Sequence, residues 1–208
     1  LAWTETTDTG RVISETRMDV DAVADLFHYF AGVVRSDEDG LKRHDPQQMS
    51  MIVREPFGVV GAIVPWNFPF LISGWKLAPA LAAGNAVVIK PATLTPLSLL
   101  TLAEITADLL PPGLLNVLPG SGRECGEAIL DHPGIRKLSF TGSTEVGRHV
   151  AAKAAARVIP ATMELGGKSA NIVFPDADWD RAVEAAAMAI MMSQGQVCSA
   201  GSRLLLHD

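Results

Sequence analysis

The sequence predicts an α/β protein with a doubly wound parallel sheet, and three observations support this fold class. Short apolar runs alternate with segments of helical periodicity from residue 58 onward. The run at 58–64 is continuously apolar, which is typical of a strand buried on both faces of a parallel sheet. At 140–147 a glycine-containing turn joins a predicted strand to a predicted helix. Such alternation of strand and helix is the pattern of a doubly wound sheet.

The first fifty residues predict a helix, a connector and an extended arm. Six apolar residues fall on one helical stripe: Val20, Val23, Ala24, Phe27, Ala31 and Val34. Asp19 or Asp21 is the expected N-cap of this helix. The charged segment 37–45 is predicted to be a connector, and 49–53 an extended arm.

Strands and helices then alternate to the end of the chain. The strands are predicted at 58–64, 85–90, 114–118, 135–140, 158–163, 170–174 and 202–206. Helices are predicted at about 76–83, 95–110, 123–131 and 143–156, and a last one begins after Asp176 or Asp178 and runs into the loop of Cys198. Thr95 is the expected N-cap of the helix at 95–110, with Pro96 at its first position.

Composition excludes several classes of partner. A net charge of −6 and a pI near 5.3 argue against binding to nucleic acid or to an anionic membrane surface. The two cysteines are too few for a disulfide framework, and the five histidines form no metal-ligand pattern, so no metal is expected. Free thiols favour a cytoplasmic location. Because residue 1 is Leu, a targeting peptide ahead of the chain stays open as an alternative.

Three residues are candidates for chemistry at one site. Cys198 follows Gly195-Gln196-Val197 and is a candidate nucleophile, while Glu164 precedes Leu165-Gly166-Gly167 and is a candidate base. Asn67, between Pro65 and Pro69, could donate to an oxyanion. Taken singly, each has a structural explanation as a buried thiol, a strand-end carboxylate or a turn residue.

Two further motifs indicate a nucleotide-binding site. Lys90 ends a strand and precedes Pro91, so it is placed for ribose hydroxyls or phosphates at the carboxyl edge of a parallel sheet. The turn at 140–147 presents backbone amides at a helix start, where a phosphate can bind. Its glycines are spaced Gly-x-x-x-x-Gly, unlike the usual dinucleotide fingerprint, so this motif alone is a weak signal.

Together the five motifs resemble one family. The segments at 65–69, 90–92, 140–147, 164–168 and 195–198 occur in the order and spacing of the NAD(P)-dependent aldehyde dehydrogenase superfamily, and the resemblance covers essentially all 208 residues. It implies a Rossmann-like cofactor domain followed by the beginning of an α/β catalytic domain. The corresponding ranges are 1–50 for a helix and arm, 51–163 for the dinucleotide-binding domain and 164–208 for the start of the catalytic domain.

The resemblance also implies roles for individual residues. Cys198 would form a thiohemiacetal and then a thioester, Asn67 would hold the oxyanion, Glu164 would activate water, and Lys76 would lie in a proton path behind Glu164. The residues implied at the cofactor are Ile63, Pro65, Trp66, Lys90, Thr93, Gly122, Gly126, Phe140, Thr141, Gly142, Ser143, Val146, Leu165 and Gly166. Those implied at the substrate are Phe68, Leu71, Ile72, Trp75, Met192, Val197 and Ser199.

One departure from the family pattern, and the composition of the substrate set, refine the expected specificity. Strictly NAD-dependent relatives carry Glu three residues after the ribose lysine, where this chain has Thr93. A hydroxyl does not repel a 2′-phosphate, so we expect NADP to be accepted comparably with NAD. The mainly apolar substrate set favours neutral aliphatic or aromatic aldehydes as the small-molecule partner.

The last expectation concerns the extent of the protein. Relatives continue well beyond the catalytic cysteine, so the chain is expected to lack the C-terminal part and the extreme N-terminus. The complete protein is expected to be a homo-oligomer, a dimer or a tetramer. Alternatives are an inactive fragment or dinucleotide-binding subunit, a relative that transfers the acyl group to coenzyme A, and ester hydrolysis as a side reaction. Glu164 favours transfer to water over transfer to coenzyme A.

Overall fold

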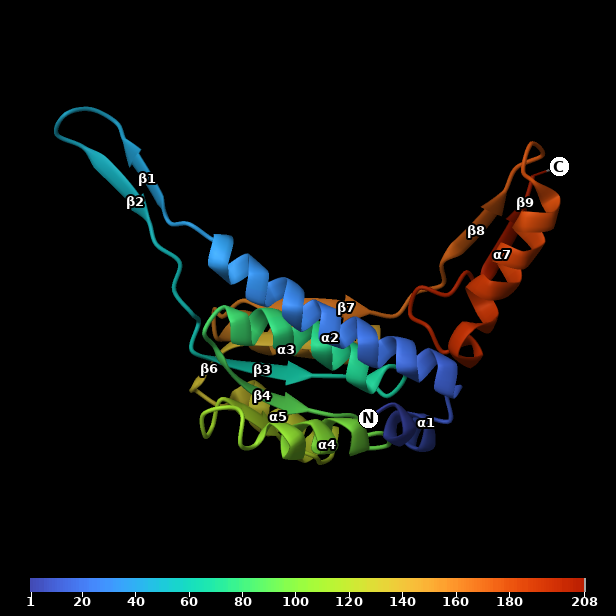
Figure 1. The fold of residues 1–208 in the computed structure, drawn as a ribbon, viewed down its shortest axis with the longest axis horizontal. Coiled ribbons are helices and arrows are strands. Elements are labelled where there is room, and N and C mark those ends of the chain that lie inside the picture. The colour runs from blue at the N-terminus through green and yellow to red at the C-terminus, as the bar shows by residue number, and fades with distance from the viewer. Residues whose placement is uncertain (208) are drawn as a thin grey trace.

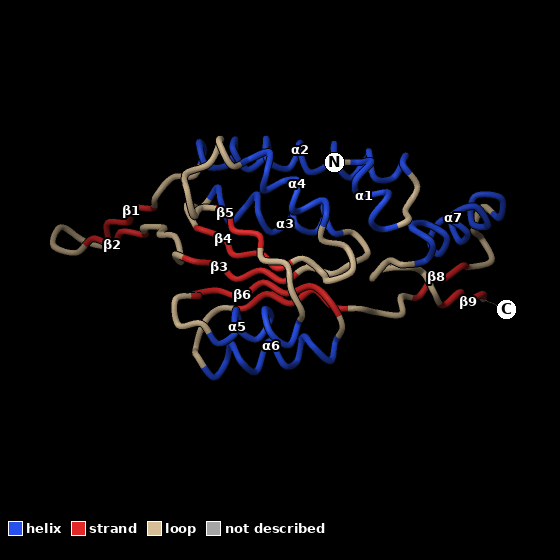
Figure 2. The backbone as a smooth tube through the Cα atoms, turned by 90° about the horizontal axis from the view of Figure 1, so that it is seen from below, coloured by secondary structure: helices blue, strands red, loops and turns tan. Residues whose placement is uncertain are grey.

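A five-stranded parallel sheet forms the centre of the computed structural model, which describes residues 1–207. Its strand order is β5 (Leu115–Val117), β4 (Ala86–Lys90), β3 (Val59–Ile63), β6 (Ile135–Gly142) and β7 (Ala161–Leu165). The first strand of this sheet along the chain is β3, in its middle, and β4 and β5 follow toward one edge. The chain then crosses back to the other side of β3, where β6 and β7 lie (Figure 2). The predicted doubly wound parallel sheet is therefore confirmed.

Helices cover both faces of this sheet. Figure 2 shows α3 (Pro69–Ala82) and α4 (Leu97–Thr106) on one face, and α5 (Glu127–Asp131) and α6 (Thr144–Ala156) on the other. A π-helical turn at Gly122–Gly126 leads directly into α5. The long helix α2 (Ile13–Ser36) packs on α3, and α1 (Ala2–Thr9) packs against α2 and α4. The N-terminal helices thus form an additional layer over one face of the sheet.

Two apolar clusters hold these layers together. One lies between the sheet and α3 and α4 and comprises Ala62, Val64, Ile72, Leu77, Val87, Ile89 and Leu99. The other lies on the opposite face and comprises Ile129, Leu130, Ile135, Leu138, Phe140, Val150 and Ala154. Each fully buried large side chain contributes about 1.5–3 kcal/mol relative to an exposed one.

Two smaller units project from this body in Figure 1. The strands β1 (Gly40–Arg43) and β2 (Met49–Ile52) pair in antiparallel fashion as a hairpin, where the sequence indicated a connector and an arm. At the other end, β8 (Ala170–Val173), α7 (Trp179–Met191), a turn at Met192–Gly195 and β9 (Arg203–Leu206) form a parallel βαβ unit. The expected range boundaries after residues 50 and 163 fall inside β2 and β7, respectively.

Helix α3 begins earlier than the sequence predicted. The expected start near Lys76 was wrong because the helix already begins at Pro69, and its end at Ala82 agrees with the prediction. The N-cap residue Phe68 makes no side-chain cap hydrogen bond. Instead Glu5 accepts a hydrogen bond from the Phe70 amide at 3.1 Å. The cap comes from a residue far away in sequence, so no local pattern could indicate it.

Two predicted caps were wrong. Helix α2 begins at Ile13, so both Asp19 and Asp21 lie inside the helix, where the Asp19 carboxylate pairs with Arg11. The N-cap of α4 is Pro96, and the Thr95 hydroxyl donates to the Trp66 carbonyl oxygen at 3.3 Å. In both cases a polar side chain that suits a local cap is used for a tertiary contact.

The last strand of the sheet starts later than expected. The sequence indicated a strand from residue 158, but Val158 has a φ of 53°, in the left-handed region that an extended strand does not use. Strand β7 therefore begins only at Ala161 and runs through Glu164 to Leu165.

Among residues 1–207 no helix combines the length and apolar content that crossing a bilayer requires. The same residues contain no group of three or more His, Cys, Asp or Glu side chains placed to bind a metal ion.

The contact between α2 and α3 depends on one glycine. A Cβ atom at Gly74 would lie 2.6 Å from Cγ2 of Val23, which is well inside van der Waals contact. Val23 is 3% exposed, so its side chain has little room to move. Only a residue without a side chain lets the two helices approach this closely.

We predict that Gly74→Ala destabilises the protein by about 1–3 kcal/mol, because it overpacks this contact. Gly32→Ala is a matched control in the same helix pair, since a Cβ there meets no atom within 4 Å. That control is expected to stabilise the protein by about 0.5–1 kcal/mol through helix propensity. Urea unfolding measures both, and equal effects of the two substitutions would contradict the assigned contact.

Candidate active site

The carboxyl ends of four sheet strands bring the predicted site residues to one edge. Ile63 at the end of β3 pairs with Lys90 on β4 and with Phe140 on β6. One step further along, Thr141 on β6 pairs with Glu164 on β7. The strand order reverses between β3 and β6, and ligands of open α/β sheets bind in the crevice outside such a reversal.

The loop after β3 contacts the loop of Cys198. The Asn67 side-chain amide donates a hydrogen bond from Nδ2 to the Gln196 carbonyl oxygen at 2.7 Å. Gly167, just beyond β7, also approaches this loop, since a Cβ atom there would lie 3.4 Å from the Cys198 carbonyl oxygen. Cys198 itself is exposed. Segments that follow β3 and β7 are therefore both in contact with the cysteine loop.

A strained turn leads into this loop. Ser193 has a φ of 48°, Gln194 of 60° and Gly195 of 76°, so three successive residues are left-handed. For residues other than glycine this conformation costs about 1–3 kcal/mol each and persists only where the surrounding structure holds it. Such strain is concentrated at functional positions, and here it lies directly before the candidate nucleophile.

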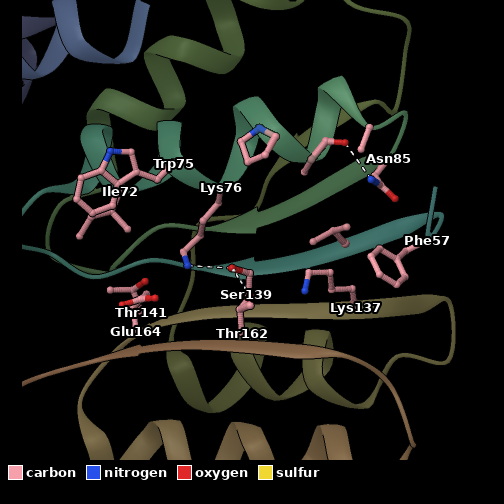
Figure 3. Close-up of a pocket in the computed structure, with 14 residues that line it drawn as sticks. Phe57, Ile72, Trp75, Lys76, Asn85, Lys137, Ser139, Thr141, Thr162 and Glu164 are labelled. Atoms are coloured by element: carbon pink, nitrogen blue, oxygen red, sulfur yellow. Dashed lines mark hydrogen bonds between the residues drawn. The ribbon is translucent and has the colours of Figure 1, made fainter. Parts of the chain in front are cut away.

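Glu164 and Lys76 share a cavity of about 580 Å³ between α3 and the strands β3, β6 and β7. In Figure 3, Lys76 reaches from α3 to β6, and its Nζ donates to Oγ of Ser139 at 2.9 Å. Glu164 lies at the same end of the cavity (Figure 3). Apolar side chains form much of the wall: Phe57, Val60, Ile72, Trp75, Pro79, Ala80 and Ala83.

The environment of Lys76 disfavours its charged form. Burial lowers the pKa of Lys76 from 10.5 to about 8, and the positive charge of Lys137 adds to this effect. The negative charge of Glu164 opposes the shift. Lys76 is therefore able to exchange a proton much closer to neutral pH than an ordinary lysine.

Lys90 has the features of a ligand-binding amine at the sheet edge. Its side chain is 4% exposed, and its Nζ donates to the Pro91 carbonyl oxygen at 2.7 Å. Burial lowers the pKa of Lys90, while the nearby Cys125 works in the opposite direction. Because an ammonium group has three donor hydrogens, Lys90 can also donate to hydroxyl groups of a ligand.

The start of α6 has a side-chain cap and a close-packed glycine. Ser143 caps the helix, its Oγ accepting from the Val146 amide at 3.3 Å. Thr141 Oγ1 is buried without a hydrogen-bond partner among the described residues. A Cβ at Gly142 would lie 2.6 Å from the Phe140 ring, so only glycine fits there. Helix N-termini of this length attract phosphate through free amides and the helix dipole.

Comparison with known proteins identifies the family of this chain. A model of the aldehyde dehydrogenase family matches residues 1–208. This chain belongs to the aldehyde dehydrogenase family. An acetaldehyde dehydrogenase of Pseudomonas aeruginosa is 49% identical over 215 residues, which cover 100% of this chain and 42% of that protein.

Solved structures of the aldehyde dehydrogenase family share this fold. PnpE from Pseudomonas sp. WBC-3 superimposes with a TM-score of 0.95 at 45% identity, over 99% of this chain and 43% of that one. The NAD+ complex of an aldehyde dehydrogenase from Bacillus cereus has a TM-score of 0.96 at 40% identity, over 99% of this chain and 42% of its own. The chain therefore spans less than half the length of the relatives it matches.

The remaining residues that the aldehyde dehydrogenase resemblance implied at the cofactor lie around the same edge. Trp66 and Val146 are about half exposed, at 46% and 47%. Thr93 is exposed, and its hydroxyl donates to the Gly120 carbonyl oxygen at 3.1 Å. Gly126 approaches Lys90, since a Cβ there would lie 4.0 Å from the lysine side chain. The other members of the set are Ile63, Pro65, Gly122, Leu165 and Gly166, and of these Leu165 packs against Gly147 of α6.

The residues implied at the aldehyde divide into two places. Ile72 and Trp75 line the cavity with Lys76 and Glu164. Met192, Val197 and Ser199 belong to the turn and loop around Cys198, and Leu71 is half-buried on α3. Phe68 lies under the Arg11 guanidinium, with 3.9 Å between the guanidinium carbon and the ring centroid. Neither Asn67 nor Cys198 lines the cavity that holds Glu164.

Sequence reasoning missed four polar residues of this cavity. Asn85, Lys137, Ser139 and Thr162 line it together with Thr141. A signal was present, because Lys137, Ser139 and Thr141 alternate with Leu138 and Phe140 along β6. Period-two alternation of this kind indicates one polar and one apolar face of a strand.

The shifted Lys76 pKa predicts a specific pH dependence of stability. Between pH 8 and 10.5 the unfolded chain keeps the Lys76 proton while the folded protein loses it, so the folded state gains stability as pH rises. Below about pH 8 the cost of burying the charge is fully present. We therefore predict that the free energy of unfolding of the wild type rises by about 1–3 kcal/mol relative to Lys76→Met across this interval.

The measurement is urea unfolding at several pH values for the wild type, Lys76→Met and Lys76→Arg. Neither replacement loses a proton in this interval, so neither should contribute the extra slope. Parallel pH curves for the wild type and Lys76→Met would show that Lys76 keeps an ordinary pKa in the folded protein.

Proposed function

We propose that the protein carrying this chain oxidises an aldehyde to a carboxylic acid with NAD or NADP. The observation that carries the proposal is the hydrogen bond from Asn67 to Gln196, which brings an amide donor to the loop of Cys198 at the carboxyl edge of the sheet. Membership of the aldehyde dehydrogenase family supports it. So do the NAD+ complexes formed by PnpE and by the Bacillus cereus enzyme.

Cys198 is the proposed nucleophile. Its thiolate adds to the carbonyl carbon and forms a carbon–sulfur bond, while the carbonyl oxygen becomes an oxyanion. The Asn67 amide has two hydrogens, and one of them is held by Gln196, so the other is free to donate to this oxyanion. Together with the Cys198 backbone amide, it forms a donor pair in which each donor is worth about 3–4 kcal/mol in the transition state.

The residues at the sheet edge fit a nicotinamide dinucleotide. Lys90 would hold ribose hydroxyls, and the α6 N-terminus at Ser143 would hold the pyrophosphate. The buried, unpartnered Thr141 hydroxyl offers a further polar contact. The dinucleotide supplies the acceptor for the hydrogen and two electrons that leave the substrate carbon. The acyl group then stays on Cys198 as a thioester.

Glu164 is the proposed base for release of the acid. As a carboxylate it accepts a proton from water, whose oxygen attacks the thioester carbon, and the carbon–sulfur bond breaks to release the acid and restore the Cys198 thiolate. Lys76, with a pKa of about 8, shares the cavity with Glu164 and is the proposed group that carries the proton away. A carboxylate in this place favours transfer of the acyl group to water over transfer to coenzyme A.

The aldehyde and the assembly are proposed on fewer observations. Met192 and Val197, in the turn and loop around Cys198, are apolar, which supports a neutral aliphatic or aromatic aldehyde. Exposed apolar side chains on the β1–β2 hairpin, at Leu41 and Met51, support a homo-oligomer. The mass of the complete protein by light scattering tests the assembly, and a monomer would exclude it.

We predict different kinetic defects for the two proposed catalytic residues. In the complete protein, Cys198→Ala should abolish NAD(P)H production from a panel of aldehydes, because no covalent intermediate can form, while the dinucleotide still binds. Glu164→Gln should lose about 10²–10⁴-fold in steady-state rate but keep a first burst of NAD(P)H, because general base catalysis acts after oxidation. Stopped-flow absorbance separates burst from steady state.

The controls are Cys125→Ser, which keeps a donor for the Leu118 carbonyl oxygen, and Glu184→Gln on the exposed surface of α7. Both should behave like the wild type. An active Cys198→Ala variant would rule out the covalent mechanism. Absence of a burst in Glu164→Gln would mean that the carboxylate acts before oxidation. Acyl-CoA as the main product would point to the acylating alternative.

Thr93 predicts the cofactor preference. We expect NADP to be used comparably with NAD, since no carboxylate at position 93 repels a 2′-phosphate. Thr93→Glu should raise the ratio of kcat/KM for NAD to that for NADP by about 10-fold or more, because like charges would then meet. Thr93→Gln is the uncharged control of similar size. A wild type that strongly prefers NAD would show that another residue sets the specificity.

A further inference from the structure

The first helix provides carboxylates to the helices that follow the sheet strands. Glu5 is fully buried, and its Oε1 accepts from the Phe70 amide at the start of α3 at 3.1 Å. Asp8 accepts from the Leu97 amide at the start of α4 at 2.8 Å. Asn67 lies just before α3, so the N-terminal segment fixes the helix start beside the proposed oxyanion donor.

The beginning of α2 holds the strained turn before Cys198. Oε1 of Glu15 accepts a hydrogen bond from the Ser193 amide at 3.1 Å. The Gln194 side chain donates from Nε2 to the Gly10 carbonyl oxygen at 2.7 Å. Ser193 and Gln194 are the two left-handed non-glycine residues of this turn. Both therefore receive a contact from residues that lie near the other end of the sequence (Figure 1).

Arg11 contacts both Glu15, which binds the cysteine turn, and Phe68, which follows Asn67. Its side chain is 2% exposed, it hydrogen-bonds to Asp19, and its guanidinium lies 3.6 Å from a Glu15 oxygen. The same guanidinium covers the ring of Phe68, the residue directly after Asn67. A buried charge is retained only when it is paired, so Arg11 is fixed by both carboxylates. One cation thus contacts the Glu15 side chain that holds the cysteine turn and the aromatic ring next to Asn67.

We propose that Glu15 is a positioning residue for the oxidation: it holds the Ser193–Gly195 turn so that the Cys198 backbone amide and the Asn67 side chain converge on one oxyanion. The inference rests on the proposed function and names a residue of that site which touches neither aldehyde nor dinucleotide. Its carboxylate acts on the turn directly through the Ser193 amide. It also affects the position of Asn67, because it pairs with Arg11, whose guanidinium packs on the neighbouring Phe68 ring.

A positioning role differs measurably from a purely structural one. Oxidation of the aldehyde needs both oxyanion donors within hydrogen-bond distance of the same oxygen. A displacement of one donor by about 1 Å can lower the rate about 100-fold. Alkylation of Cys198 by iodoacetamide forms no oxyanion, so it reports the thiol alone. Glu15→Gln keeps an oxygen that can accept from the Ser193 amide, whereas Glu15→Ala removes the acceptor. Asp25→Ala, at an exposed position of the same helix, is the matched control.

The experiment compares the complete wild-type protein with these variants. We expect Glu15→Ala to slow the NAD(P)H burst by about 10- to 100-fold. Cys198 alkylation and the KM for the dinucleotide should stay within about threefold of the wild type. Glu15→Gln should recover most of the burst rate, and Asp25→Ala should match the wild type. A Glu15→Ala burst as fast as that of Asp25→Ala, or an equal loss in burst and alkylation, would overturn the positioning role.

A second variant guards against failure of Glu15→Ala to fold. Gln194 is exposed, so Gln194→Leu removes the contact to Gly10 without disturbing the core. It should slow the burst by about 3- to 10-fold and leave alkylation unchanged, and an unchanged burst would count against the inference. If the wild type oxidises no aldehyde, the proposed function fails and the positioning role with it. If the wild type is active and the variants match Asp25→Ala, the positioning role alone fails.

Discussion

The hydrogen bond between the Asn67 amide and the Gln196 carbonyl oxygen is the contact on which the site depends. It joins a loop that follows the central strand β3 to a loop that follows α7, in a separate βαβ unit. Pro65 and Pro69 limit the freedom of the first loop, and the left-handed turn at Ser193–Gly195 shapes the second. This short hydrogen bond joins the two loops, and contacts from Glu15 and Gly10 hold the turn of the second loop.

Burial of charge is the second recurring constraint. Lys76 is held in an apolar cavity with Glu164 and Lys137, and the outcome is a pKa near 8 and not a tight ion pair. Burial likewise raises the pKa of Glu5 and Asp19. Arg11 and backbone amides offset part of this cost, since an unpaired buried charge would be far more costly. Glu5 and Arg11 contact the segment at Phe68 and Phe70 that follows β3, and Glu164 lies near the carboxyl end of β7, where a dinucleotide and an aldehyde are proposed to meet.

Much of the fold could be read from the sequence, because its signals are local. The apolar run at 58–64 predicted β3, the helix predicted at about 143–156 is α6, and Asp178 was one of the two expected caps of α7. The helix starts and caps that were predicted wrongly involve tertiary contacts. Glu5 caps α3, and Thr95 and Asp19 leave their expected capping roles for Trp66 and Arg11. A local pattern cannot show which of two partners a polar side chain will choose.

The sequence by itself determined the family, the parallel sheet and the identity of Cys198, Glu164 and Asn67 as candidates, because motif spacing and periodicity are properties of the chain. Only the tertiary structure decided which groups meet. It brought Lys76 to Ser139 and Asn67 to Gln196, and it brought Glu15 to the turn before Cys198. These contacts join residues that are far apart along the chain, and their geometry follows from how the helices pack over the sheet. No pairwise pattern in the sequence encodes that packing.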